Sequence, residues 1–410
     1  MKQGKRIITD TMLGTIGLVV MNAVLSLVVY PFLGGRIGAE AQGKVLFFTS
    51  VANLLAGTFG SAANYARLKI FSEKRKTENG DYNIFLLVSF AFEILLFIAA
   101  ILMKKDTAGA TWVGIIIVGF MTTLRYYADV EFRLKLRYGL FCLYYVSIAA
   151  GYLLGLLLYL WTGRWVLIFL AGETFGFLFV FFAGTIFRKD LTKTSPDFKK
   201  NMGVMAGLAL AYVLSDFVGL SDRLLFPLIL PNGGDEMTSL YYYASLVGKT
   251  MSLLSTPLNG VLMGHLSNKE GDVSRKNFLK ITGALLGVFV LVTIVSVIGS
   301  NIFVYLFYND YYEAVKPLFL LTNAGQVLFF VCNTLMVIVL RYSHPRNQLI
   351  TSVVYIVAFF TVTVPLILKF GIFGMAYGIL IVNSLKFILF AVLGFFSAKK
   401  EEKTGNLPPA

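Results

Sequence analysis

The sequence consists largely of apolar runs of about 20 residues, the length that an α-helix needs to cross the hydrocarbon core of a bilayer. Hydrophobic residues make up 57% of the chain and charged residues 14%, whereas a soluble domain has roughly 45–50% apolar and roughly 25% charged residues. The sequence therefore predicts an all-α integral membrane protein with about twelve spans. The predicted spans are 11–33, 45–66, 82–102, 111–131, 139–160, 164–187, 201–230, 237–266, 279–300, 314–340, 347–369 and 372–397.

A polar, proline-containing segment, RKDLTKTSPDFKK at residues 188–200, divides the predicted spans into two sets of six. It is typical of a linker between two structural units. We therefore expect an N-terminal lobe over residues 1–187 and a C-terminal lobe over residues 201–398, followed by a cytoplasmic tail at residues 399–410.

A weak sequence repeat relates the two lobes. Pro31 and Pro227 occupy equivalent places near the end of a span, and Glu40 and Glu236 follow them at the same offset. Because six spans return the chain to its starting side, such a repeat is parallel, with its axis along the membrane normal. The pattern predicts two pseudo-symmetric six-helix lobes around a central cavity, the architecture of a transporter.

Lysine and arginine are distributed unequally between alternate loops. Of the 36 such residues, most lie in the N-terminal segment, the linker and the other loops of the same side, and few lie in the opposite loops. Because Lys and Arg in short loops stay cytoplasmic, we expect a multi-pass protein of the cytoplasmic membrane with both termini in the cytoplasm. This asymmetry also accounts for the net charge of +14 without a nucleic-acid partner.

Several ionisable side chains lie inside the predicted spans, where each costs roughly 2.5–3.5 kcal/mol on insertion scales and must face a partner, a cavity or water. A guanidinium at Arg125 suits a phosphate, but it also suits snorkelling to the interface. Glu93 and Glu173 are candidates for ion coupling, and the alternative is a neutral, hydrogen-bonded carboxyl. The full set is Glu93, Arg125, Glu173, Asp216, Asp222, Arg223, Lys249 and Lys386.

One face of the predicted span 237–266 is polar, because Tyr242, Ser245, Lys249, Ser252 and Thr256 recur at intervals of three and four. A lysine within such a stripe can hold an anion or a counter-carboxylate. We interpret this face as cavity lining, with a structural ion pair as the alternative.

In the preceding predicted span, Asp216 and Arg223 share a helical face, and Asp222 points about 100° away from it. We treat Asp216 and Asp222 as further cavity-lining candidates. A pair that only stabilises helix packing is the alternative.

The sequence contains no pattern of an enzyme. No predicted loop is long enough for an extramembrane active site, and no GxxxxGK[ST] nucleotide-binding loop occurs. The two histidines, His265 and His344, have no metal-ligand spacing. We therefore expect no catalytic residues, no metal and no cofactor, with transport driven by an ion gradient or by a downhill substrate.

Three stretches of the sequence carry a resemblance to a known family: YPFLGGRIGAEAQGKVLFFTSVANLL, LSDRLLFPLIL followed by LYYYASLVGKTMSLLSTPLNGVL, and YNDYYEAVKPLFLL. Through them, and over nearly its whole length, the chain resembles the polysaccharide-exporter branch of the multidrug/oligosaccharidyl-lipid/polysaccharide superfamily, the Wzx-type flippases.

The resemblance implies alternating access between inward-open and outward-open states, with proton or sodium coupling. Its implied substrate is an undecaprenyl-pyrophosphate-linked oligosaccharide, and the implied partners are membrane lipids, a polysaccharide polymerase and a chain-length regulator. By the same analogy, the candidates for binding the substrate head group are Arg125, Arg223, Lys249 and Lys386.

Two other functions compete with the flippase. A cation-coupled multidrug exporter would have the same fold, but it would favour an acidic cavity, whereas the charges within the predicted spans include at least as many bases as acids. A polysaccharide polymerase or ligase would need an extended catalytic loop. The sequence favours the flippase over both.

Overall fold

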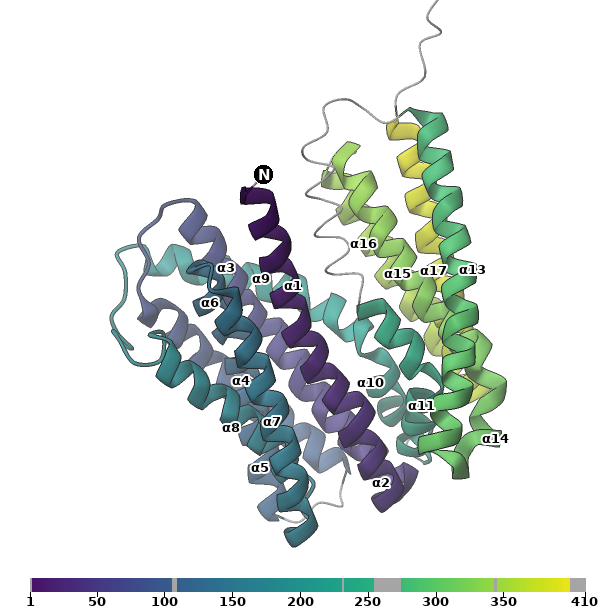
Figure 1. Ribbon diagram of the computed structural model, residues 1–410, viewed down its shortest axis with the longest axis horizontal. Helices are drawn as coiled ribbons and strands as arrows, with labels where there is room; N and C mark the ends of the chain where they lie inside the picture. The colour runs from purple at the N-terminus through teal and green to yellow at the C-terminus, as the bar shows by residue number, and fades with distance from the viewer. Residues whose placement is uncertain (1, 105–108, 231, 254–273, 343–344, 399–410) are drawn as a thin grey trace, which may run out of the picture. The chain divides into compact units, whose positions relative to one another are not determined.

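The computed structural model describes residues 2–104, 109–230, 232–253, 274–342 and 345–398, and its regular elements there are helices (Figure 1). They group into two units, Met1–Ser239 and Leu240–Ala410. The helices of the first unit are α1 (Lys2–Ala23), η1 (Val24–Val29), α2 (Tyr30–Leu55), η2 (Ala56–Gly60), α3 (Ser61–Ser72), α4 (Asn79–Lys104), α5 (Gly109–Ala128), α6 (Val130–Leu134), α7 (Tyr138–Thr162), α8 (Val166–Ala183), α9 (Phe198–Gly219) and α10 (Ser221–Ile229).

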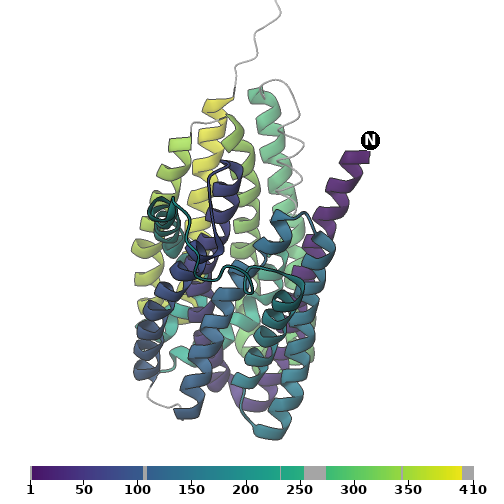
Figure 2. The same cartoon turned by 90° about the vertical axis from the view of Figure 1, so that its left-hand side faces the viewer.

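The helix α11 (Gly234–Leu253) begins in the first unit and continues into the second. In Figure 2 the green α15 and the yellow α17 of the second unit run side by side. The remaining helices of this unit are α13 (Arg275–Phe307), η3 (Asn309–Tyr311), α14 (Tyr312–Val315), η4 (Lys316–Leu318), α15 (Phe319–Tyr342), α16 (Pro345–Ala358), η5 (Phe359–Thr363) and α17 (Val364–Ser397).

The described helices confirm the expected all-α membrane class. Nine stretches within the described ranges are long and apolar enough to cross a bilayer. Two of them, Met12–Phe71 and Ile350–Ser397, contain 60 and 48 residues, and each covers two predicted spans. The second part of the predicted span 237–266, including Thr256, lies outside the described residues, as does the predicted tail.

Single glycines, not loops, separate the spans within these two long stretches. Gly38 has φ 78° and ψ 170°, and Gly371 has φ 56° and ψ −126°. Positive φ is accessible to glycine without a steric penalty, so one residue is enough to break each helix. The loop expected between the predicted spans 11–33 and 45–66 is thus a break at Gly38.

Two π-helical segments precede prolines within spans. The segment η1 ends just before Pro31, and η5 ends just before Pro365. Proline lacks an N–H and its ring clashes with the preceding helical turn, and a wider π turn accommodates both defects. Pro227 lies inside α10, which ends two residues later at Ile229. The further kink expected at Pro257 lies outside the described residues.

Close helix packing in the first unit depends on glycine. A Cβ on Gly155 of α7 would lie 2.5 Å from the Cα of Ile168 in α8, and one on Gly172 would lie 2.1 Å from the ring of Tyr152. Small residues allow membrane helices to approach closely. This contact brings Tyr152 of α7 next to the residue that follows Gly172, which is Glu173.

The second unit has its own apolar core. Phe278 of α13, Leu335 and Val339 of α15, and Phe390 of α17 are buried together. A Cβ on Gly394 would lie 2.1 Å from the ring of Phe278. The core holds α13, α15 and α17 together, while α9 and α10 group with the first unit. The expected division into two lobes of six spans stays a prediction.

Candidate functional site

Arg125 and Glu173 form an ion pair inside the first unit. The Arg125 Nε on α5 lies 3.0 Å from Glu173 Oε2 on α8, and the two side chains are 10% and 3% exposed. The Tyr152 hydroxyl donates a hydrogen bond of 3.1 Å to Glu173 Oε1. The guanidinium also lies 5.0 Å from the centre of the Tyr126 ring. A head-group candidate and an ion-coupling candidate from the sequence therefore neutralise each other.

Glu93 on α4 is a buried carboxyl with a single hydrogen-bond partner. The Thr123 hydroxyl on α5 donates to its Oε1 at 2.8 Å, and its Oε2 is buried without a partner among the described residues. Within the part of the chain that the structure describes, no basic side chain forms an ion pair with it. An ionised carboxylate in an apolar interior needs such a cation. The site therefore suits a carboxyl that carries a proton.

Asp216 on α9 lies against the π segment η2. A Cβ on Gly57 would be only 2.3 Å from Asp216 Oδ2, so glycine makes room for this half-buried carboxylate. Among the described residues, no hydrogen bond or ion pair to that carboxylate occurs. One turn earlier on α9, Tyr212 packs against Tyr65 with ring centres 5.9 Å apart. A carboxylate near aromatic rings is a chemistry that suits an organic cation.

The candidates on α10 and on the described part of α11 differ in burial. Asp222 is buried, and Arg223 is half-buried. Tyr242 and Ser245 are fully buried, whereas Lys249 is half-buried.

Two serine hydroxyls of the predicted polar face bond to their own helix. The Ser245 hydroxyl donates to the Tyr242 carbonyl at 3.5 Å, and that of Ser252 donates to the Lys249 carbonyl at 2.7 Å. Their role in lining a cavity stays a prediction.

Lys386 lies in the second unit, in the middle of α17. Its Nζ donates a hydrogen bond of 3.1 Å to Asn333 Oδ1 on α15. It also lies 4.7 Å from the ring centres of Phe329 on α15 and Tyr355 on α16. The structure thus surrounds this candidate with groups from two neighbouring helices.

The predicted linker packs against the start of α4. The buried Asp81 carboxylate accepts hydrogen bonds from the Ser195 amide at 2.8 Å, the Ser195 hydroxyl at 2.6 Å and the Asn201 side chain at 3.0 Å. Lys193 pairs with Glu78 at 2.9 Å, and this hydrogen-bonded carboxylate raises the pKa of the Lys193 amine. The segment is therefore anchored within the first unit.

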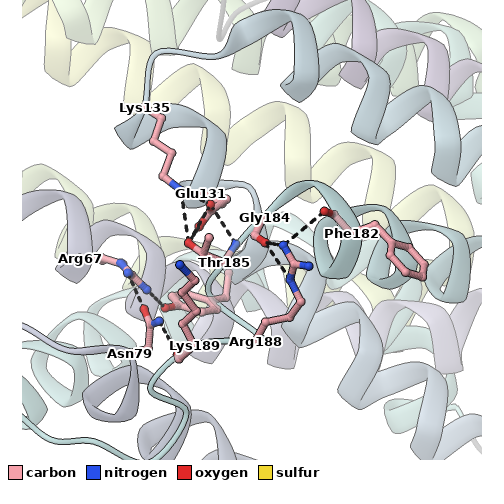
Figure 3. Close-up of polar contacts among 10 residues, drawn as sticks. Arg67, Asn79, Glu131, Lys135, Phe182, Gly184, Thr185, Arg188 and Lys189 are labelled. Carbon is pink, nitrogen blue, oxygen red and sulfur yellow. Dashed lines mark hydrogen bonds and ion pairs between the residues drawn. The ribbon is translucent and has the colours of Figure 1, made fainter.

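Residues from several predicted cytoplasmic loops meet at this end of the first unit (Figure 3). Arg67 donates to Asn79 Oδ1 at 2.7 Å, and the Asn79 amide donates to the Lys189 carbonyl at 2.7 Å. The Thr185 amide donates to Glu131 Oε1 at 3.0 Å. These contacts join α3, α4, α6 and the segment that follows α8.

A second group of contacts in the first unit involves Lys104 and Asp235. Lys104 Nζ lies 2.5 Å from Asp235 Oδ1, with side chains 8% and 13% exposed. A Cβ on Gly43 of α2 would lie 1.8 Å from the Asp235 carbonyl oxygen. The Ser239 hydroxyl donates to the Ala39 carbonyl at 2.7 Å. These contacts join α2, α4 and the start of α11.

The charged residues predicted from the sequence have neutral partners that the sequence pattern did not indicate. Thr123 and Tyr152 bind the carboxyl groups of Glu93 and Glu173. A second missed group is Asn323 of α15, which is fully buried, donates to the Ser300 hydroxyl at 2.9 Å and accepts from the Gly248 amide at 2.7 Å. The sequence signal for this group was an asparagine inside a long apolar run, which must find hydrogen-bond partners when it is buried.

No group of three or more His, Cys, Asp and Glu residues suited to a metal ion occurs within the described ranges. His265 and His344 lie outside those ranges. The polar centres of the described structure are thus ion pairs, single buried acids and a buried lysine.

Comparison with known proteins gives a fold. No family model matches the sequence, and no curated protein matches it. Among solved structures, a multidrug resistance MATE family transporter of the MOP superfamily, in an inward-facing conformation, has a TM-score of 0.64 at 13% identity, covering 93% of this chain and 93% of its own. The chain has the fold of the MATE transporters.

Two further structures show the same MATE fold. A variant of the Vibrio cholerae MATE transporter VcmN has a TM-score of 0.62 at 12% identity, with 96% of each chain covered. A eukaryotic MATE transporter has a TM-score of 0.58 at 16% identity, covering 96% of this chain and 94% of its own. These similarities show the fold alone, so the superfamily expected from the sequence and its polysaccharide-exporter branch stay predictions.

Proposed function

We propose that this chain is a membrane exporter that works by alternating access. The observation that carries the proposal is the MATE fold over 93% or more of the chain. The similar proteins are transporters, and none of the three is an enzyme by its description. The polar centres within the spans support the same function, because each must have a partner or a role to offset its insertion cost.

The comparisons favour a multidrug substrate, and we propose small organic cations as its class. One structural neighbour is described as a multidrug resistance transporter. In this chain, Asp216 supplies a carboxylate without a protein partner among the described residues, and Tyr65 and Tyr212 lie near it. The pairing of Arg125 with Glu173 removes one base from the set that argued for an anionic substrate.

An undecaprenyl-pyrophosphate-linked oligosaccharide is the substrate class that the sequence favours. Its support is the resemblance to Wzx-type flippases and the bases Arg223 and Lys249 on neighbouring segments. Both are half-buried and therefore within reach of solvent or substrate. In this function the cytoplasmic membrane is the location, and the lipid-linked oligosaccharide crosses it to reach a polymerase.

Proteoliposomes containing the purified protein distinguish these substrates. If a fluorescent organic cation is exported, and this export falls in Asp216→Asn but not in Lys249→Ala, the substrate is an organic cation. If a fluorescent lipid-linked oligosaccharide is translocated, and this translocation falls in Arg223→Ala and Lys249→Ala but not in Asp216→Asn, the substrate is the lipid-linked oligosaccharide. Movement of neither probe by folded protein rejects both substrates.

Glu93 is the residue that we propose for proton coupling. Glu93→Gln keeps an acceptor for Thr123 and removes the exchangeable proton, so we expect transport that no longer responds to a pH gradient. The measurement is initial transport rate with and without an imposed gradient. Glu40→Gln is the control, because Glu40 is 71% exposed and pairs with Lys44. An unchanged gradient response in Glu93→Gln would exclude the role.

A further inference from the structure

The surroundings of Lys386 have the chemistry of a cation site. Its ammonium is 3.1 Å from the amide oxygen of Asn333, and two ring faces lie on it, those of Phe329 and Tyr355, each with its centre at 4.7 Å. Carbonyl-type oxygens and aromatic faces are both electron-rich toward a cation. The negative faces of rings disfavour an anion, so this environment does not suit the head group of an anionic lipid.

A second set of contacts orients the site. The Tyr355 hydroxyl donates to Asn383 Oδ1 at 3.2 Å, and the Asn383 amide donates to the Gly325 carbonyl at 2.9 Å. The Cys332 thiol donates to the Asn383 carbonyl at 3.3 Å. The ring of Tyr355 is therefore held by α17 and α15 independently of the lysine.

The ammonium has no anion to neutralise it in the described structure. Among the described residues, no carboxylate lies within 4 Å of Lys386 Nζ. The titratable groups that face it are Cys332 of α15 and Tyr355 of α16. The helices α15 and α16 thus supply one oxygen and two rings, and the positive charge itself comes from α17.

We propose that Phe329, Asn333 and Tyr355 form a binding site for a primary ammonium group, and that Lys386 fills it with a cation tethered to the chain. The tethered ammonium bridges α15, α16 and α17. No inorganic cation is then needed at this place. The ammonium site itself does not depend on the proposed function. Only a role of this bridge in transport rests on that function.

Removal of the tether tests the site by chemical rescue. Lys386→Ala leaves the oxygen and the two rings in place around an empty volume, so ethylammonium chloride should raise the thermal unfolding midpoint of this variant saturably, by about 2 °C or more. Sodium chloride at the same ionic strength and ethanol should not. Lys386→Met, which fills the volume without charge, should show no rescue.

A matched control is Lys369→Ala. Lys369 is an exposed lysine that lies 5.2 Å from the ring centre of Phe370, so it has a cation–π contact but no enclosed site. Its variant should not respond to ethylammonium. Equal responses of Lys386→Ala, Lys386→Met and Lys369→Ala would overturn the proposal.

Asn333→Asp tests whether Lys386 is charged, even when Lys386→Ala does not fold. A carboxylate placed 3.1 Å from a true ammonium forms an ion pair, so Asn333→Asp should unfold at a higher temperature than Asn333→Leu. In a Lys386→Met background the order should reverse, because the new carboxylate is then buried alone. The same order in both backgrounds would contradict a charged lysine.

These measurements need no transport, so they separate the site from the proposed function. Rescue of stability in a protein that transports neither probe would leave the ammonium site standing and reject the exporter. Transport by a protein whose Lys386→Ala variant is not rescued would support the exporter and reject the ammonium site. Where both hold, ethylammonium should also restore transport to Lys386→Ala.

Discussion

Replacing Arg125 by methionine should lower the stability of the protein by roughly 3–5 kcal/mol, because it leaves a buried charge without its partner. Glu173 would keep neutral hydrogen-bond partners such as the Tyr152 hydroxyl, at 3.1 Å, but no cation. Glu173→Gln should be worse than Arg125→Met, because an orphaned glutamate can take up a proton whereas an arginine stays charged. Thermal and denaturant unfolding of the purified protein measures both.

The double variant Arg125→Met/Glu173→Gln is the decisive control. It removes both charges, so it should regain more than half of the stability that either single variant loses. The pair of Lys44 and Glu40, whose side chains are 23% and 71% exposed, gives the baseline. Lys44→Met leaves only the exposed carboxylate and should change stability by less than about 1 kcal/mol. Additive losses in the double variant would show that Arg125 and Glu173 do not act as a pair.

Replacing Gly43 by valine should open the contact between α2 and α11. A Cβ there would lie 1.8 Å from the carbonyl oxygen of Asp235 and 2.9 Å from its Cα, and backbone atoms cannot rotate away. Overpacking of this kind costs typically about 1–3 kcal/mol, and a shift of about 1.4 kcal/mol is a tenfold change in an equilibrium. The ion pair of Lys104 with Asp235 should break in the same step.

Accessibility of a cysteine reports this opening. Thr238 is fully buried and its hydroxyl bonds within its own helix, so Thr238→Cys is a mild probe in a background without native cysteines. Its reaction with a membrane-impermeant thiol reagent should be about tenfold faster in Gly43→Val. Gly35→Val is the control, since nothing lies within 4 Å of a Cβ there. Equal rates in the two variants would contradict the contact.

The helices were predictable because the length and hydropathy of a run are local properties. The predicted spans also end and begin on either side of Gly38 and Gly371. What could not be predicted is that a single glycine with positive φ, and not a loop, makes each break, because this depends on the backbone conformation of one residue.

The charged residues within the spans can be selected from the sequence, but their partners cannot. Arg125 and Glu173 were selected because a charge within a span is unfavourable, but their contact depends on how α5 and α8 pack. That packing follows from glycines such as Gly172, whose neighbour is Tyr152. Neutral partners such as Asn333 gave a weaker signal than the charged residues, because a lone amide in a span has a small insertion cost beside that of a lysine.

Transport by the purified wild-type protein tests the central proposal most directly. Proteoliposomes are loaded with either the fluorescent organic cation or the fluorescent lipid-linked oligosaccharide, and a pH or sodium gradient is imposed. An alternating-access exporter should move one of the two probes in proportion to the amount of protein and faster with the gradient than without it. If folded protein moves neither probe faster than empty liposomes do under either gradient, this result would contradict the exporter function.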